Sequence, residues 1–329
     1  MQSFEWVDAT SIEQAATLLA AGNPSKPVVA KAGGMDLLDL MKEGIISPAR
    51  VVNLKSIRGL DGLSFGEPEG LNLGALITLA RIATAPEIRQ RYVALAEAAA
   101  HASTPQVRNA ATIGGNLLQR PRCWYFRSEY FRATRDDIDE HVRDGENQYH
   151  AIFDNRRSAI VHASTPATAL VAYDARVELT GPQGKQRRVP LKDFFLAPDA
   201  RRERDTAIER GEVLTRLIVP PPGAGTRAAY HKQTERESYD WPICDVAVVL
   251  RMQGRSVRSA SIVMGWVAPT PRRAFESERI LTGKNVSEDL AREAARAAIA
   301  GATPLSKNAY KVPVLEAVVR RTILAAAAA

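Results

Sequence analysis

Two glycine pairs are the residues of this chain that most plainly fit a chemical role. One lies in the run Lys31-Ala-Gly-Gly-Met-Asp36, and the other lies in Thr112-Ile-Gly-Gly-Asn116. A glycine turn before a helix directs backbone N–H groups at one spot and adds the partial positive charge of the helix N-terminus, which suits a phosphate. Two such turns facing each other could hold a pyrophosphate. Neither run has the P-loop or Rossmann spacing, and each pair taken alone is also explained by a tight turn.

Metal binding and nucleophilic catalysis find little support among the other residues. The chain has two cysteines, Cys123 and Cys244, and five histidines. No histidine pair has H-x-x-x-H or H-E-x-x-H spacing, two cysteines cannot supply a four-sulfur cluster, and there is no G-x-S-x-G elbow. We therefore expect no metal site and no catalytic residue in this chain. A Ser-His-Asp triad assembled from distant residues stays open.

The composition is that of a globular protein of about two domains. The chain has 329 residues, of which 45% are hydrophobic and 25% charged, so disorder, collagen and coiled coil are poor explanations. The formal net charge is +7, a mild excess that suits an anionic ligand or an acidic partner. Two cysteines exclude a disulfide framework and favour a reducing compartment. With no signal-peptide pattern and no apolar run near the roughly 20 residues of a membrane span, we expect a cytoplasmic protein.

The first glycine pair lies between a predicted strand and a predicted helix. Residues 27–30 form a short apolar run, and leucines at helical spacing follow over 37–41. Before them, Ser11 to Gln14 is a capping box that opens an amphipathic helix. Residues 88–100 predict one continuous helix, and further strands are predicted at 51–54, 71–74, 175–179 and 213–219.

A change of composition follows the second glycine pair. Residues 119–157 are rich in arginine, aspartate and aromatic residues and have little apolar periodicity, which predicts a long inserted loop on the surface. Arginines interleaved with Trp124, Tyr125 and Phe126 could bind single-stranded nucleic acid. The acidic run 136–140 follows directly and would repel phosphates. We therefore expect no nucleic-acid partner.

The best domain boundary is the run Pro220-Pro-Pro-Gly-Ala-Gly225, which can form neither a helix nor a central strand. It divides the chain into residues 1–222 and residues 223–329. The second part predicts two strands, at 245–251 and 259–266, followed by two helices. Lys232 stands just after the boundary and would matter only if the two domains close over a ligand.

Longer strings around the glycine pairs resemble a known family. Residues 30–38 and the string Pro105-Gln-Val-Arg-Asn-Ala-Ala-Thr-Ile-Gly-Gly-Asn-Leu117 are similar to the FAD-binding medium subunits of the molybdenum hydroxylases. This group includes xanthine dehydrogenase, carbon monoxide dehydrogenase and bacterial aldehyde oxidoreductases. Residues 212–220 and 264–274 extend the resemblance nearly to both ends. The length of these strings outweighs the tight-turn explanation.

The resemblance implies an α+β fold with a two-lobed FAD-binding domain of the vanillyl-alcohol-oxidase (PCMH) type over 1–222. A smaller C-terminal α+β domain would follow over 223–329. Thr165 stands where the family often has an acid, Ala102 stands where xanthine dehydrogenase has an aromatic contact, and Lys232 is the candidate for tuning the flavin. The implied FAD-binding residues are Ala30, Lys31, Ala32, Gly33, Gly34, Met35, Asp36, Leu37, Ala102, Thr112, Ile113, Gly114, Gly115, Asn116, Thr165, Leu214 and Lys232.

The resemblance also implies a role in electron transfer. In the family, a large partner subunit holds molybdopterin-bound molybdenum, and a small subunit holds two [2Fe–2S] clusters that pass electrons to FAD. This flavoprotein would then be one part of a heterotrimeric oxidoreductase, with no substrate turnover of its own. The resemblance does not decide the final electron acceptor, which could be NAD, oxygen, a quinone or a carrier protein. A self-contained FAD oxidase and a flavin-less scaffold are the alternatives.

The inserted loop resembles that of one subgroup, the periplasmic aldehyde oxidoreductases. Their loop holds a four-iron cluster on four cysteines. This chain keeps only Cys123 of that set, so we expect the loop without the cluster. The same subgroup raises the alternative of a periplasmic location, reached by export with a partner that carries the signal.

Overall fold

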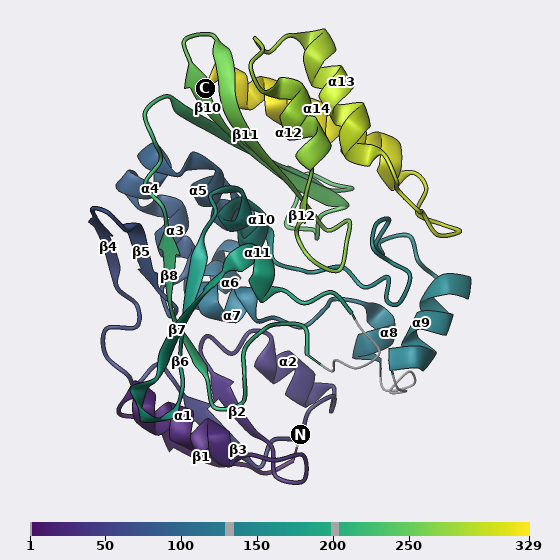
Figure 1. The fold of residues 1–329 in the computed structure, drawn as a ribbon. Coiled ribbons are helices and arrows are strands. Elements are labelled where there is room, and N and C mark those ends of the chain that lie inside the picture. Colours follow the sequence, from purple (N-terminus) through teal and green to yellow (C-terminus); the bar gives the residue numbers. More distant parts are fainter. Residues whose placement is uncertain (1, 129–134, 199–203) are drawn as a thin grey trace.

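The computed structural model describes residues 2–128, 135–198 and 204–329. Figure 1 shows two lobes, one above the other, and a third layer in which a sheet is covered by the C-terminal helices. Helices and strands of mixed order confirm the predicted α+β class. Within these residues no helix has both the length and the apolar character needed to cross a bilayer.

The first lobe is a small parallel sheet with two helices. Its elements are β1 (Glu5–Asp8), α1 (Ile12–Ala21), β2 (Val28–Lys31), α2 (Leu37–Lys42) and β3 (Arg50–Asn53), and the strand order is β1-β3-β2. The predicted strand, glycine turn and helix are confirmed as β2 and α2. The predicted cap is confirmed too, since the Gln14 N–H donates to the Ser11 hydroxyl at 3.1 Å.

The second lobe is a five-stranded antiparallel sheet covered by helices. The strand order is β4-β5-β8-β6-β7. The strands are β4 (Leu63–Gly66), β5 (Gly70–Gly74), β6 (Arg176–Thr180), β7 (Gln186–Pro190) and β8 (Val213–Val219), and the helices are α3 (Leu79–Thr84), α4 (Pro86–Arg91), α5 (Val93–Ala100), α6 (Pro105–Ala110), α7 (Ile113–Leu117), α10 (Thr165–Ala172) and α11 (Leu191–Phe194). The central strand β8 joins the lobes, because Val213 packs in the core of the first lobe and Leu217 in that of the second.

The predicted continuous helix over 88–100 is wrong. The chain leaves the helical conformation at Tyr92, where φ is −131° and ψ is 50°, so α4 and α5 are separate helices. The Tyr92 side chain is fully buried, and its hydroxyl donates to the Pro220 carbonyl oxygen at 3.2 Å. The break directs the Tyr92 ring into the core. Its hydrogen bond to Pro220 joins residues far apart in sequence, so a local pattern does not predict it.

The C-terminal sheet lies between two groups of helices. Its strands are β9 (Thr226–Gln233), β10 (Cys244–Gln253), β11 (Ser256–Gly265) and β12 (Arg272–Arg273), and its helices are α12 (Phe275–Leu281), α13 (Glu288–Ile299) and α14 (Lys311–Ala328). Alternate residues of β10 face opposite sides: Val246 and Val248 pack under these helices, and Ala247 and Val249 pack in the core of the second lobe. Helices α5 and α10 cover that second face.

The inserted segment 119–157 is folded rather than a surface loop, so that prediction is wrong for its described residues. It contains α8 (Trp124–Arg127) and α9 (Arg135–Asp144), while residues 129–134 lie outside the described part. The buried side chains of Cys123, Tyr125 and Val142 form a small core with Trp266 of the C-terminal domain. These apolar residues are far apart in sequence, which explains the missing periodicity.

A buried carboxyl group joins the C-terminal sheet to the second lobe. Asp245 on β10 is fully buried and accepts from the Tyr230 hydroxyl at 2.7 Å and from the Thr168 hydroxyl of α10 at 3.1 Å. Burial raises the pKa of the Asp245 carboxyl from 3.8 to about 7. The folded chain therefore binds this proton over a pH range in which the unfolded chain has released it.

We predict that Asp245→Asn flattens the pH dependence of stability. Between about pH 4 and pH 7 the unfolded chain binds fewer protons at this site, so the free energy of unfolding of the wild type falls as the pH rises, by roughly 2 to 4 kcal/mol. Urea unfolding across this window measures the fall. The exposed Asp61→Asn serves as control, and an equal fall in Asp245→Asn and wild type would contradict the assignment.

Candidate functional site

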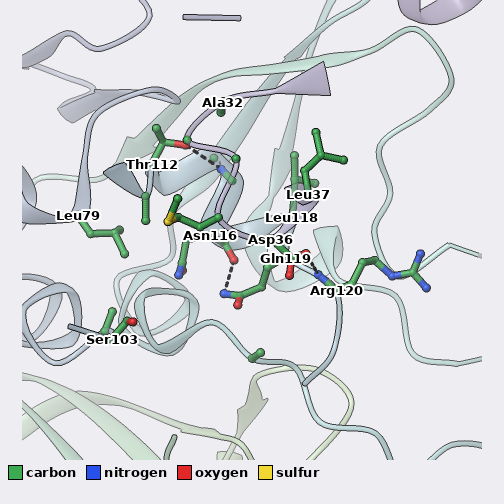
Figure 2. Close-up of a pocket in the computed structure, with 18 of the residues that line it drawn as sticks. Ala32, Asp36, Leu37, Leu79, Ser103, Thr112, Asn116, Leu118, Gln119 and Arg120 are labelled. Carbon is green, nitrogen blue, oxygen red and sulfur yellow. Dashed lines mark hydrogen bonds between the residues drawn. The ribbon is translucent and has the colours of Figure 1, made fainter. Parts of the chain in front are cut away.

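A cavity of about 640 Å³ lies between the two lobes and the C-terminal sheet, and we call it the central cavity. Figure 2 shows residues of both glycine turns around it. The structure brings together residues from β2, α2, α7, α10, β8 and β9. The predicted residues that line it are Ala30, Ala32, Gly33, Gly34, Met35, Asp36, Leu37, Ala102, Thr112, Gly114, Gly115, Asn116, Thr165, Leu214 and Lys232.

Two predicted residues do not line the central cavity. The Lys31 ammonium lies 5.2 Å from the centre of the Trp6 ring, in a cation–π contact. Ile113 is fully buried in the core of the second lobe. Both belong to the turns that form the cavity, but the Lys31 ammonium lies over the exposed Trp6 ring and the Ile113 side chain packs in the core of the second lobe.

The first glycine turn presents unpaired backbone donors. The N–H groups of Ala32, Gly33, Gly34, Met35 and Asp36 donate to no acceptor within the residues that the structure describes. The carbonyl groups of Gly34 and Asp36, by contrast, accept from the N–H groups of α2. Five consecutive free N–H groups beside a cavity fit an anion with several oxygens, such as a phosphate.

Residues 113–116 of the second glycine turn do not add free donors, so this part of the expected pyrophosphate cradle is not met. The N–H groups of these four residues all donate within the protein. Ile113 donates to the Ile77 carbonyl and Gly114 to the Ala75 carbonyl, each at 2.9 Å. Gly115 donates to the Thr112 hydroxyl at 3.2 Å and Asn116 to the Thr112 carbonyl at 2.8 Å. The second turn therefore supplies a close, smooth wall, and the first turn supplies the donors.

Three of the four glycines in the two turns have different steric roles. A Cβ on Gly33 would overlap the carbonyl oxygen of Ala110, so the two turns are in backbone contact there. Gly34 has φ of 81°, a left-handed conformation that other residues adopt only at a cost. A Cβ on Gly115 would have only the Thr112 hydroxyl near it, at 3.1 Å. A larger side chain at Gly115 would therefore occupy space in the cavity.

Two arginines of the inserted segment hold the first turn of α2. Arg127 pairs with Asp36 at 2.6 Å and with Asp39 at 2.5 Å, and Arg122 pairs with Asp36 at 3.1 Å. The Arg120 backbone N–H also donates to Asp36, at 2.8 Å, as Figure 2 shows. Burial lowers the pKa of the Arg122 guanidinium. Sequence reasoning missed Arg122 and Arg127 as site residues, and the run Arg122-Cys-Trp-Tyr-Phe-Arg127 was the available signal.

The opposite side of the cavity carries a lysine from the C-terminal sheet. Lys232 on β9 donates from Nζ to the His101 carbonyl oxygen at 2.9 Å, and burial lowers the pKa of its ammonium. The Thr165 hydroxyl donates to the Ala98 carbonyl oxygen at 3.2 Å, so it stabilises the protein backbone. The second part of the chain thus forms one side of the cavity, which is the condition under which Lys232 could contact a ligand.

Two lining residues that sequence reasoning missed have strained backbone. Ser103 has φ of 58° and Trp266 has φ of 61°, in the left-handed region. Such strain is concentrated at functional sites. The other missed lining residues include Leu54, Leu76, Leu79, Val107, Glu212, Trp241 and Pro242. Most are apolar and scattered along the chain, so no local motif marks them.

Metal ligands are not gathered anywhere in the described part of the chain. No group of three or more histidine, cysteine, aspartate or glutamate side chains there is placed to hold a metal ion. Cys123 lies 3.2 Å from Nε2 of His150, beside the inserted segment's small core. The expectation of a cluster-free insertion stays a prediction.

Two family models cover the chain. The model described as the FAD binding domain in molybdopterin dehydrogenase matches residues 2–222, and the model of the CO dehydrogenase flavoprotein C-terminal domain matches residues 229–326. A similar solved structure is the carbon monoxide dehydrogenase from Hydrogenophaga pseudoflava which lacks the Mo-pyranopterin moiety of the molybdenum cofactor. It has a TM-score of 0.77 and 28% identity, over 99% of this chain and 98% of that chain.

Curated relatives agree with these matches. The aldehyde oxidoreductase FAD-binding subunit of Escherichia coli is 31% identical over 290 residues, which cover 85% of this chain and 86% of the relative. The carbon monoxide dehydrogenase medium chain of Hydrogenophaga pseudoflava is 30% identical over 328 residues, which cover 98% of this chain and 96% of the relative. The chain therefore belongs to the family of FAD-binding medium subunits of the molybdenum hydroxylases.

Proposed function

We propose that this chain holds FAD in the central cavity and passes electrons from [2Fe–2S] clusters of a small partner subunit to an external acceptor. A large partner subunit with molybdopterin-bound molybdenum would oxidise the substrate. The observation that carries the proposal is the row of free N–H groups over Ala32–Asp36 at the wall of the central cavity. They fit the pyrophosphate of FAD, and the second glycine turn forms the facing wall.

FAD, when bound, accepts electrons singly or in pairs and delivers them in either way, so it suits a junction between one-electron clusters and a two-electron acceptor. The chain's own residues bind and orient it. The first turn donates N–H groups, and Arg122 and Arg127 fix α2 through Asp36 and Asp39. Lys232 brings a positive charge to the opposite side. In a scaffold subunit without flavin, the five free N–H groups at the cavity would have no ligand to bind. We therefore favour FAD binding over a scaffold role.

One prediction from this proposal concerns the wall formed by Gly115. Gly115→Val adds a side chain toward the cavity without a backbone clash, because only the Thr112 hydroxyl lies within 4 Å of the added Cβ. We expect FAD retention after gel filtration to fall about tenfold or more, since a clash of about 1.4 kcal/mol already weakens binding by that factor. Gly66→Val is the control, because a Cβ there meets nothing within 4 Å. Full retention in Gly115→Val would contradict the placement.

A second prediction concerns the charge of Lys232. A nearby positive charge stabilises the negative charge that enters FAD on reduction, so Lys232→Gln should lower the midpoint potential by roughly 30 mV or more, equivalent to about 1.4 kcal/mol for two electrons. Spectroelectrochemical titration of the flavin measures this. Lys284→Gln, at an exposed position of the C-terminal domain, should leave the potential unchanged. Equal potentials in Lys232→Gln and wild type would exclude the tuning role.

The proposed division of labour is tested by reconstitution. The isolated chain should show no steady turnover of aldehydes or N-heterocycles with any dye, because no catalytic base or metal is expected in it. The complex with molybdenum and iron–sulfur subunits should lose its flavin absorbance when such a substrate is added. Turnover by the isolated chain would instead favour a self-contained FAD oxidase.

A further inference from the structure

A second cavity of about 400 Å³, which we call the side cavity, adjoins the central cavity. Its wall comes chiefly from the inserted segment and from the connection between β9 and β10. Arg122, Trp241, Pro242 and Trp266 line both cavities. The proposed binding of FAD does not use the side cavity.

Aromatic side chains with accessible surface line the side cavity. Trp124 is 38% exposed, Tyr239 is 57% exposed and Trp241 is 59% exposed. Tyr149, which is half-buried, lines it too. Several large aromatic side chains that stay open to solvent around one hollow are typical of a binding surface.

The rings of this wall lie in different planes. The Trp124 and Tyr149 rings have their centres 5.7 Å apart and their planes at 76°. Trp241 stacks on the buried Trp266 ring, with centres 6.4 Å apart and planes at 25°, so its exposed ring is held in place. A flat ligand could stack on only one of two nearly perpendicular rings, whereas a compact cation can approach the π-face of each, to within about 6 Å of the ring centre.

One carboxylate of the side cavity has no cationic partner. The exposed Glu235 accepts from the Tyr149 hydroxyl at 2.6 Å, and no lysine or arginine forms an ion pair with it in the described part of the chain. The ring of His150, at the same wall, adds no positive charge near pH 7, because burial lowers its pKa to about 4. The charge of Glu235 is thus available to a ligand.

The cations around the side cavity are already paired or enclosed. Arg236 pairs with Asp240 at 2.9 Å, and Arg122 pairs with Asp36 at 3.1 Å. The Lys311 ammonium is fully buried behind the wall and donates to three backbone carbonyl oxygens, at 2.7 to 3.3 Å. A positively charged ligand would therefore meet aromatic rings and an uncompensated carboxylate.

We propose that the side cavity binds a small organic cation that carries a quaternary ammonium group. Its methyl groups would contact the faces of the aromatic rings, and its charge would lie near the Glu235 carboxylate. A quaternary ammonium group has no N–H bonds to water, so it loses no hydrogen bond on entering a wall of rings, unlike the primary ammonium of a lysine. This site is additional to the proposed FAD site and does not depend on it.

A matched pair of probes tests the role of the charge. Choline carries the ammonium group, and 3,3-dimethylbutan-1-ol has the same shape with carbon in place of nitrogen. Calorimetric titration of the full FAD-loaded chain at constant ionic strength should show one site for choline, with a Kd of about 1 mM or below, and at least tenfold weaker binding of the alcohol. Equal affinities, or no binding of choline up to about 10 mM, would overturn the proposal.

Two substitutions test the named groups. Tyr239→Ala removes a ring that lines the side cavity but not the central one, and should weaken choline binding about fivefold. Glu235→Gln keeps the shape and an acceptor for the Tyr149 hydroxyl, and should weaken choline binding about threefold while leaving the alcohol unaffected.

The controls are exposed residues that line neither cavity. Phe275 is 60% exposed, close to the value for Tyr239, and Glu87 is an exposed glutamate of α4. Phe275→Ala and Glu87→Gln should bind choline as the wild type does. Wild-type affinity for choline in both Tyr239→Ala and Glu235→Gln would refute the proposed site.

FAD retention, measured on the same samples, separates this inference from the proposed function. Tyr239→Ala and Glu235→Gln should keep FAD after gel filtration as the wild type does. A chain that retains FAD but does not distinguish choline from the alcohol would refute the cation site alone. A chain that binds choline selectively but retains no FAD would refute the proposed function and support the cation site.

Discussion

The carbonyl oxygen of Ala110 occupies the place where a side chain on residue 33 would have to lie. Gly33 therefore lets the first lobe rest, backbone on backbone, against the second, and the width of the central cavity depends on that contact. The neighbouring Gly34, with φ of 81°, turns the chain so that consecutive N–H groups have no acceptor in the described part of the protein. A turn that closes two lobes and also leaves five donors unpaired is suited to an anion held between them.

The inserted segment gives this site features of its own. Its arginines neutralise Asp36 and Asp39 at the start of α2, so the donor turn is held from outside by a segment that packs on the C-terminal domain. The Lys311 ammonium donates to the carbonyl oxygens of Tyr149 and His150, and so holds the C-terminal part of the same segment. The insertion thus forms one wall of the central cavity.

Local patterns predicted the local parts of the structure. The helix cap at Ser11, the strand and helix around the first glycine turn, and β8 over 213–219 are found as expected, since each depends on neighbouring residues. The break at Tyr92 and the pairing of Arg127 with Asp36 depend on residues distant in sequence, and no local pattern carries them. The free donors of the first turn were inferred from its glycines. In the second turn, the N–H groups of Ile113 and Gly114 are paired with carbonyl groups of Ile77 and Ala75, which are distant in sequence.

Hydrogen exchange at the two turns tests the central claim most directly. Mass spectrometry of the FAD-free and FAD-loaded chain would compare peptides that cover residues 32–36 with peptides that cover residues 113–116. The N–H groups of the first turn are free and should exchange fast without FAD and slowly with it, while those of the second turn are already bonded within the protein and should change little. Unchanged fast exchange over 32–36 after FAD loading would contradict the account, because the pyrophosphate would then be held elsewhere.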